Sequence, residues 1–190
     1  MPNLNLTGEF YPSFTARTAI YSDADKVCIQ QTVDRLLSVQ TSAEQPGMLL
    51  GKIQSGKTKT FLGAIALAFD NGFDIAIILT KGTKALTRQT LERVRRDFSS
   101  FVEQDRLQLF DIMTVPASLT GYELNQKLIF VAKKQPDNLD RLATLFTARY
   151  PQLANKRILI IDDEADYASV GFRATAQQNI EAPTNSNNFT

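Results

Sequence analysis

The chain has 190 residues, of which 43% are hydrophobic and 22% charged, and its formal net charge is +1. It is about one domain long, and no apolar run approaches the roughly 20 residues that a membrane span needs. Cys28 is the single cysteine and histidine is absent, which excludes disulfides, Cys/His zinc sites and any mechanism with an imidazole base. The first residues lack the basic start and apolar run of a secretory signal, so we expect a cytoplasmic protein without a membrane span.

The first 39 residues divide into two parts. Residues 1–22 contain Pro2, Gly8 and Pro12 and show no sustained hydrophobic period, which predicts an irregular arm packed on the surface. From Asp23 to about Val39 the apolar residues recur at helical spacing, and Asp23 or Asp25 can cap the predicted helix.

Strands and helices then alternate. Continuous apolar runs predict buried strands, periodic runs predict helices, and Asn71-Gly72 supplies a left-handed helix stop. Asp137 can cap the last helix, which Tyr150-Pro151 ends. The predicted strands are Met48–Leu50, Ile75–Leu79, Leu107–Val115, Leu128–Ala132 and Arg157–Ile161, and the predicted helices after residue 39 are Lys57–Phe69, Ala85–Phe98 and 137–150. This order indicates an α/β fold with a mostly parallel sheet.

A glycine-rich motif joins the first predicted strand to the helix that follows it. Gly51 to Thr58 fits the pattern G-x-x-x-x-G-K-[ST] at every fixed position, which is typical of a phosphate-binding loop. Such a loop points backbone amides and a helix amino terminus at the phosphates, while Lys57 adds a full charge and Thr58 places its hydroxyl on magnesium. The predicted nucleotide-binding residues are Gly51, Gln54, Ser55, Gly56, Lys57 and Thr58.

An acidic cluster follows the last predicted strand and supplies the other half of such a site. The carboxyl ends of parallel strands share one edge of a sheet, where ligands bind in open α/β folds. We expect Asp163 to join the Mg²⁺ shell and Glu164 to orient and polarise the attacking water, so that Lys57, Asp163 and Glu164 form the catalytic set. Asp162 directly follows the apolar run, and it is an alternative metal-linked carboxylate.

These motifs resemble those of the superfamily 2 helicases and translocases, DEAD-like ATPases whose first RecA-like domain pairs a phosphate loop with a DEAD box. Asp163-Glu164-Ala165-Asp166 reads DEAD. The resemblance is nearest to helicase-like ATPases linked to restriction and phage defence, and it covers roughly Leu49 to Ser169. It implies a RecA-like ATPase domain over residues 23–170, followed by a polar tail over 171–190, with ATP and Mg²⁺ as cofactors.

The resemblance also implies a nucleic-acid partner, with DNA favoured over RNA. The segment Thr80 to Gln89 is similar to a family motif that touches the nucleic-acid backbone, which would carry over to Gly82, Thr83 and Lys84. Several basic residues in and after this segment support phosphate binding, although a charged helix is often only a solvated face. Gln30 or Gln31 would read the adenine if the family's upstream glutamine is present, and a surface glutamine is the simpler account.

Two family features are missing from the sequence. No Ser/Thr-Ala-Thr segment follows the DEAD box, and a second RecA-like domain, which would supply an arginine to the transition state, is absent. We therefore expect these residues to be a fragment of a longer ATP-hydrolysing motor that binds nucleotide and turns it over very slowly by itself. The alternatives are a nucleotide-gated binding or scaffold module without productive turnover, and another class of P-loop protein.

Overall fold

The computed structural model describes residues 4–16, 21–39, 41–42, 45, 47, 57–81 and 83–163, with Lys57 described by its backbone alone. Within these residues, four strands form one sheet in which every pairing is parallel, in the order β2-β3-β1-β4. The strands are β1 (Ile75–Thr80), β2 (Leu107–Asp111), β3 (Lys127–Lys133) and β4 (Ile158–Asp162). The expected α/β fold with a parallel sheet is therefore confirmed, while the predicted strand Met48–Leu50 and the tail 171–190 lie outside the described residues.

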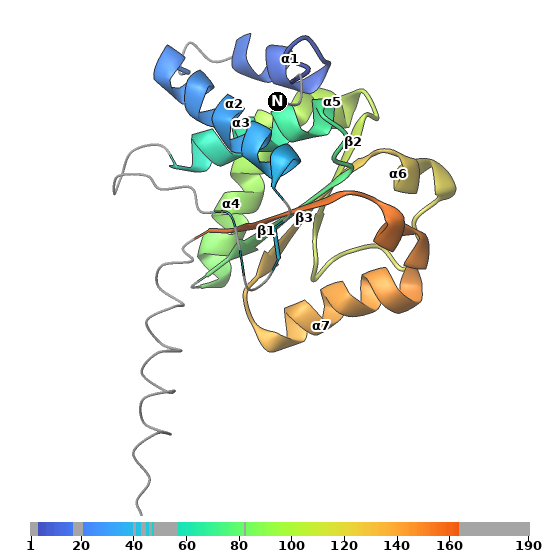
Figure 1. Ribbon diagram of the computed structural model, residues 1–190. Coiled ribbons are helices and arrows are strands. Elements are labelled where there is room, and N and C mark those ends of the chain that lie inside the picture. The colour runs from blue at the N-terminus through green and yellow to red at the C-terminus, as the bar shows by residue number, and fades with distance from the viewer. Residues whose placement is uncertain are drawn as a thin grey trace, which may run out of the picture.

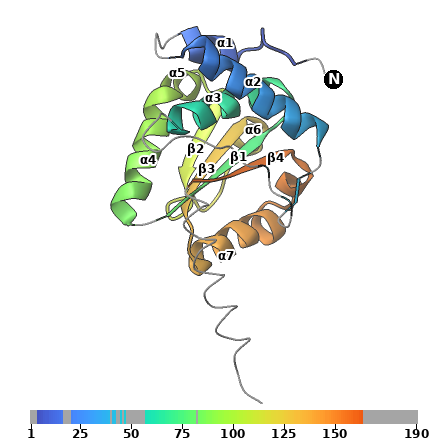
Figure 2. The ribbon, with the colours of Figure 1, turned by 60° about the vertical axis from the view of Figure 1, so that its left-hand side comes forward.

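Helices cover both faces of the sheet (Figures 1 and 2). On one face α3 packs directly against the strands, with α1, α2, α4 and α5 around it, and on the other lie α6, α7, η1 and η2. The helices are α1 (Phe10–Ala16), α2 (Asp23–Ser38), α3 (Lys57–Asp70), α4 (Lys84–Asp97), α5 (Ser99–Glu103), α6 (Gly121–Asn125), α7 (Pro136–Thr144), η1 (Leu145–Arg149, π-helical) and η2 (Pro151–Asn155, 3₁₀). In the described part of the chain, no helix is both long and apolar enough to cross a membrane.

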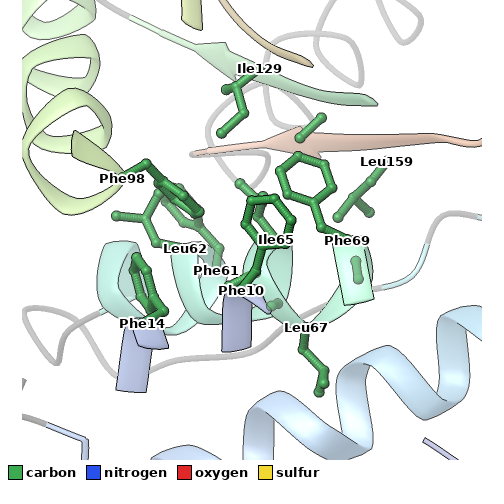
Figure 3. Close-up of a cluster of buried hydrophobic side chains, with 14 of the residues drawn as sticks. Phe10, Phe14, Phe61, Leu62, Ile65, Leu67, Phe69, Phe98, Ile129 and Leu159 are labelled. Atoms are coloured by element: carbon green, nitrogen blue, oxygen red, sulfur yellow. The ribbon is translucent and has the colours of Figure 1, made fainter. Parts of the chain in front are cut away.

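The amino-terminal arm is not irregular, because α1 lies within it. Phe10, Tyr11 and Phe14 of this helix are buried. The Phe10 ring packs edge-on against Phe69 of α3 at 5.4 Å between centroids, and Phe14 lies 4.9 Å from Phe98 (Figure 3). These aromatic residues are therefore part of the main hydrophobic core, because they meet partners distant in the chain.

Two predicted helix caps are corrected by the structure. Ser22, rather than Asp23 or Asp25, caps α2, and Asp25 completes a capping box by accepting from the Ser22 backbone N–H at 2.9 Å. In α7, Gln135 is the N-cap residue and Pro136 opens the helix, because proline lacks the N–H that would be unsatisfied there. Asp137 therefore lies inside the first turn, where its charge still favours the helix dipole.

Local interactions determine where α3 and β2 end. Gly72 has φ +89° and stops α3, as predicted, because glycine adopts the left-handed conformation without a Cβ penalty. Strand β2 ends at Asp111 rather than at Val115, since the Asp111 Oδ1 accepts from the Met113 backbone N–H at 2.9 Å and bends the chain into a turn.

Candidate functional site

The carboxyl edge of the sheet is where β1 ends at Thr80, β3 at Lys133 and β4 at Asp162. Residues 71–74 join α3 to β1, so the two elements run in opposite directions. A 14-residue helix is about 21 Å long and a six-residue strand about 20 Å. The amino end of α3, with Lys57 and Thr58, therefore lies at the same edge as the end of β4 and Asp163 (Figure 1).

The two faces of β4 separate the neighbouring aspartates. Leu159 and Ile161 pack into the core cluster that contains α3, whereas Ile158 packs into the cluster on the α7 face. Side chains alternate along a strand, so Asp162 belongs to the α7 face and the next residue, Asp163, falls on the α3 side. The Asp163 backbone N–H donates to the Leu79 carbonyl at 3.0 Å, which holds this residue against the end of β1.

Asp162 is engaged by a lysine that sequence analysis did not single out. The Lys134 Nζ donates to Asp162 Oδ2, and both side chains are 30% exposed. Within the described residues, the Asp162 Oδ1 is buried without a hydrogen-bond partner. The available sequence signal was the basic pair Lys133-Lys134 directly after a buried apolar strand. Its meaning depends on the order of the strands, which the sequence alone leaves open.

A second ion pair connects the first turn of α3 to α2. The Lys59 Nζ lies 2.7 Å from Asp25 Oδ2, and the Tyr21 hydroxyl donates to the Lys59 carbonyl at 2.9 Å. The hydrogen bond from Lys59, together with those from Ser22, lowers the pKa of the Asp25 carboxyl from its usual 3.8 to about 2. Burial, with the nearby Asp97 and Asp25 charges, raises the pKa of Tyr21. These contacts fix the amino end of α3 next to Thr58, which is half-buried.

The start of α4 lies beside the same edge, because it follows the end of β1. Thr83 caps this helix, its side chain accepting from the Leu86 N–H, and Lys84 is exposed in the first helical position. Inside, the Thr80 and Thr87 hydroxyls hydrogen-bond at 2.9 Å and tie the helix to the strand end. Thr83 and Lys84 are therefore at the carboxyl edge, as a nucleotide-coupled contact would need, whereas Gly82 lies outside the described residues.

The basic residues of α4 differ in their pairing. Arg88 forms an ion pair with Glu92 at 2.9 Å, and Arg96 with Asp97 at 3.0 Å. Arg93 and Arg95 are exposed, and no ion pair is found for either among the described residues. They are consequently the α4 arginines best able to meet an external phosphate.

The upstream glutamines Gln30 and Gln31 both lie on α2. Burial raises the pKa of the Tyr11 hydroxyl, and Gln30 only partly offsets this rise. The Gln30 side chain is half-buried. Gln31 is exposed on the surface of α2.

Much of the predicted phosphate site lies outside the described residues. This applies to Gly51, Gln54, Ser55, Gly56, Glu164 and the side chain of Lys57. Among the described residues, no group of three or more His, Cys, Asp or Glu side chains could hold a metal ion. A Mg²⁺ ion bound to a nucleotide needs fewer protein ligands, since phosphates and water complete its shell. One carboxylate and one hydroxyl at this edge fit that requirement.

A surface hollow of about 300 Å³ lies at the opposite edge of the sheet. Glu9, Arg106, Tyr122 and Lys127 are among the residues that line it. Three of its charged side chains already have partners, because Arg106 pairs with Glu9 at 2.8 Å and Lys127 with Asp74 at 3.1 Å. The amino edge of a parallel sheet is also not where ligands of open α/β folds bind, so we assign this hollow no role at the site.

Comparisons with known proteins leave the family open. No protein-family model matches the sequence, and no curated protein matches it significantly.

Proposed function

We propose that this chain is the ATP-binding motor domain of a nucleic-acid-dependent ATPase, a helicase or translocase that hydrolyses ATP with Mg²⁺. The observation that carries the proposal is that the two motifs adjoin the same edge of the sheet. The motif Gly51–Thr58 runs directly into the amino end of α3, and that end shares an edge of the sheet with the strand that leads into Asp163-Glu164. A phosphate loop and an acidic pair are useful together only in this arrangement.

The phosphate loop and the acidic pair supply residues with different roles in the proposed reaction. The amides of the loop and the amino end of α3 bind the phosphates, and Lys57 contributes positive charge near the β and γ phosphates. Thr58 and Asp163 hold the metal ion, which neutralises charge on the phosphates when it is bound. Glu164 orients and polarises the attacking water. Asp163 is preferred to Asp162 because Asp163 falls on the α3 side of β4, whereas Asp162 lies on the α7 face.

The finer fold in this proposal is RecA-like. An all-parallel sheet with helices on both faces is compatible with that fold. Lys57 at the start of α3 and Asp163 after β4 then take the positions of the phosphate-loop lysine and the DEAD-box aspartate.

The nucleic-acid contact in this proposal is the amino end of α4 with its outer face. Thr83 and Lys84 lie at the same edge of the sheet as the end of β4, so nucleotide state and nucleic-acid contact could be coupled through β1. Exposed Arg93 and Arg95 add positive charge near the carboxyl end of this helix. Lys and Arg that meet phosphates release counterions, which makes the binding strongly dependent on salt.

Nucleotide binding is tested by calorimetric titration of the purified chain with Mg²⁺ and ATP. Lys57→Ala should abolish the heat of binding, and Lys52→Ala is the matched control, because Lys52 occupies a variable position of the same loop. Equal binding by wild type and Lys57→Ala would refute the proposed phosphate site.

Turnover separates the motor from the alternative, a nucleotide-gated scaffold. A single-turnover assay with excess protein over radiolabelled ATP detects even slow hydrolysis. Glu164→Gln should retain ATP binding and lose hydrolysis, because the glutamine amide cannot accept the proton of the attacking water. Hydrolysis at the wild-type rate in Glu164→Gln would remove the proposed base and favour the scaffold.

A further inference from the structure

Two buried threonines join the start of α4 to the end of β1. Thr80 is 3% exposed and Thr87 7% exposed, and with Asn138 they are the buried polar residues found in the described part of the chain. We propose that Thr80 and Thr87 are positioning residues, whose paired hydroxyls hold the amino end of α4 where Thr83 and Lys84 contact a nucleic-acid strand. This inference rests on the proposed function and adds to it two residues buried behind the contact surface.

The hydroxyl pair belongs to a short chain of hydrogen bonds. The Thr80 and Thr87 Oγ1 atoms lie 2.9 Å apart, and either can be the donor. When Thr87 donates, the Thr80 hydroxyl donates to the Ala132 carbonyl of β3 at 3.5 Å. When Thr80 donates, the Thr87 hydroxyl donates to the Thr83 carbonyl at 3.5 Å. In both arrangements the pair links α4 to β1 and continues to β3 or to the cap of the helix.

Thr87 is the one buried residue in the first half of α4. Residues 84–86, 88 and 89 are exposed, and the next buried residue along the helix is Val94. Apolar packing is not directional, whereas a hydrogen bond weakens steeply as its angle departs from linear. The hydroxyl pair therefore sets the orientation of the first turn of α4, where the Thr83 side chain caps the helix.

The same strand end adjoins the proposed nucleotide site. The Leu79 carbonyl, next to Thr80, accepts the Asp163 backbone N–H at 3.0 Å. Two adjacent residues of β1 are thus hydrogen-bonded to the end of β4 and to the start of α4. The proposed nucleic-acid contact and the proposed nucleotide site consequently share these two residues as their support.

The test is binding of single-stranded DNA, followed by fluorescence anisotropy at several salt concentrations. Thr87→Val and the double variant Thr80→Val/Thr87→Val should each weaken the affinity about fivefold, because without the hydrogen bond the binding position of α4 is populated less. The salt slope should fall by about 1, since Lys84 no longer meets its phosphate. Thr87→Ser keeps the hydroxyl and should bind as the wild type does. Thr32→Val is the matched control, because it removes a half-buried threonine hydroxyl that donates to the Cys28 carbonyl of α2 at 2.7 Å.

Urea denaturation separates positioning from a loss of stability. Thr87→Val leaves the buried Thr80 hydroxyl without this partner and should destabilise the fold, whereas the double variant removes both hydroxyls and should be close to the wild type in stability. The stable double variant should nevertheless bind DNA as weakly as Thr87→Val, because the affinity follows the hydrogen bond and not the stability.

Wild-type DNA affinity in the double variant would overturn the inference, as would an equal loss in Thr32→Val or a loss in Thr87→Ser as large as that in Thr87→Val. A wild-type chain that does not bind DNA would overturn the nucleic-acid part of the proposed function, and this inference with it. A titration with Mg²⁺ and ATP reports separately on the nucleotide site. Its affinity should be the same in the double variant as in the wild type, and a fivefold loss there would overturn the specific link to the nucleic-acid contact.

Discussion

Replacing Asp70 should loosen the amino-terminal helix from the rest of the fold. Asp70 is the last residue of α3, and its carboxylate accepts the backbone N–H groups of Glu9, Phe10 and Tyr11 at 2.7 to 3.1 Å. An acidic residue at a helix carboxyl end is locally unfavourable by about 0.3–1 kcal/mol. Its presence here is explained by the start of α1, which it caps from a distant part of the chain.

The expected cost follows from two estimates. Hydrogen bonds to a charged acceptor contribute roughly 1.5–3 kcal/mol each, but exposed amides recover bonds to water when the acceptor is removed. Loss of a helix N-cap costs typically about 1 and at most about 2 kcal/mol. Since one carboxylate serves three amides, we expect Asp70→Ala to lower the free energy of unfolding by about 2 kcal/mol, after the relief at the end of α3 is subtracted.

Urea denaturation followed by circular dichroism measures this change, and Glu9→Ala is the control. The Glu9 side chain forms a surface ion pair with Arg106, and Glu9→Ala keeps the backbone N–H that donates to Asp70, so this change should cost less than about 1 kcal/mol. Asp70→Asn keeps one acceptor oxygen and should have an intermediate effect. A loss below about 0.5 kcal/mol in Asp70→Ala would refute the capping argument, as would unchanged hydrogen exchange at the Phe10 and Tyr11 amides.

Three further predictions address other parts of the molecule. The Asp25 carboxyl has a folded-state pKa of about 2, below its usual 3.8. Its contribution to stability, about 1–2 kcal/mol, is therefore present above pH 4 and should be lost as the pH falls toward 2. Asp25→Asn should flatten this part of an acid unfolding curve, and an unchanged curve in this variant would contradict the prediction. Phe98→Ala should destabilise the fold by about 3–5 kcal/mol in the same urea assay, because Phe98 is fully buried between Phe14 and Phe101. A loss under about 1 kcal/mol would place these rings outside the core. Arg93→Ala/Arg95→Ala should leave the melting temperature unchanged and reduce the salt slope of single-stranded DNA binding by roughly 1–2, whereas an unchanged slope would remove α4 from the proposed interface.

The sequence predicts the sheet well because its signal is local. Ile75–Leu79 and Leu128–Ala132 are continuous apolar runs with clear boundaries, and both strands are found with ends that differ by at most one residue. The stop of α3 at Asn71-Gly72 is local too, since it depends on the conformational freedom of a single glycine.

What sequence analysis missed depends on contacts between distant segments. The burial of α1 requires Phe69, Phe98 and Phe101, none of which is near it in sequence. The ion pair of Lys134 with Asp162 exists only because β1 lies between β3 and β4. The prediction of Asp25 as the cap of α2 is a different kind of error. Ser22 is the N-cap residue, and Asp25 belongs to the same capping box three positions later.

The most direct test of the account is a crystal structure of the chain with Mg²⁺ and a non-hydrolysable ATP analogue. The account predicts the triphosphate at the amino end of α3, with the Lys57 ammonium at the β and γ phosphates and Mg²⁺ between the Thr58 hydroxyl and the Asp163 carboxylate. A nucleotide bound elsewhere on the molecule, or a metal ion held by Asp162 in place of Asp163, would contradict it.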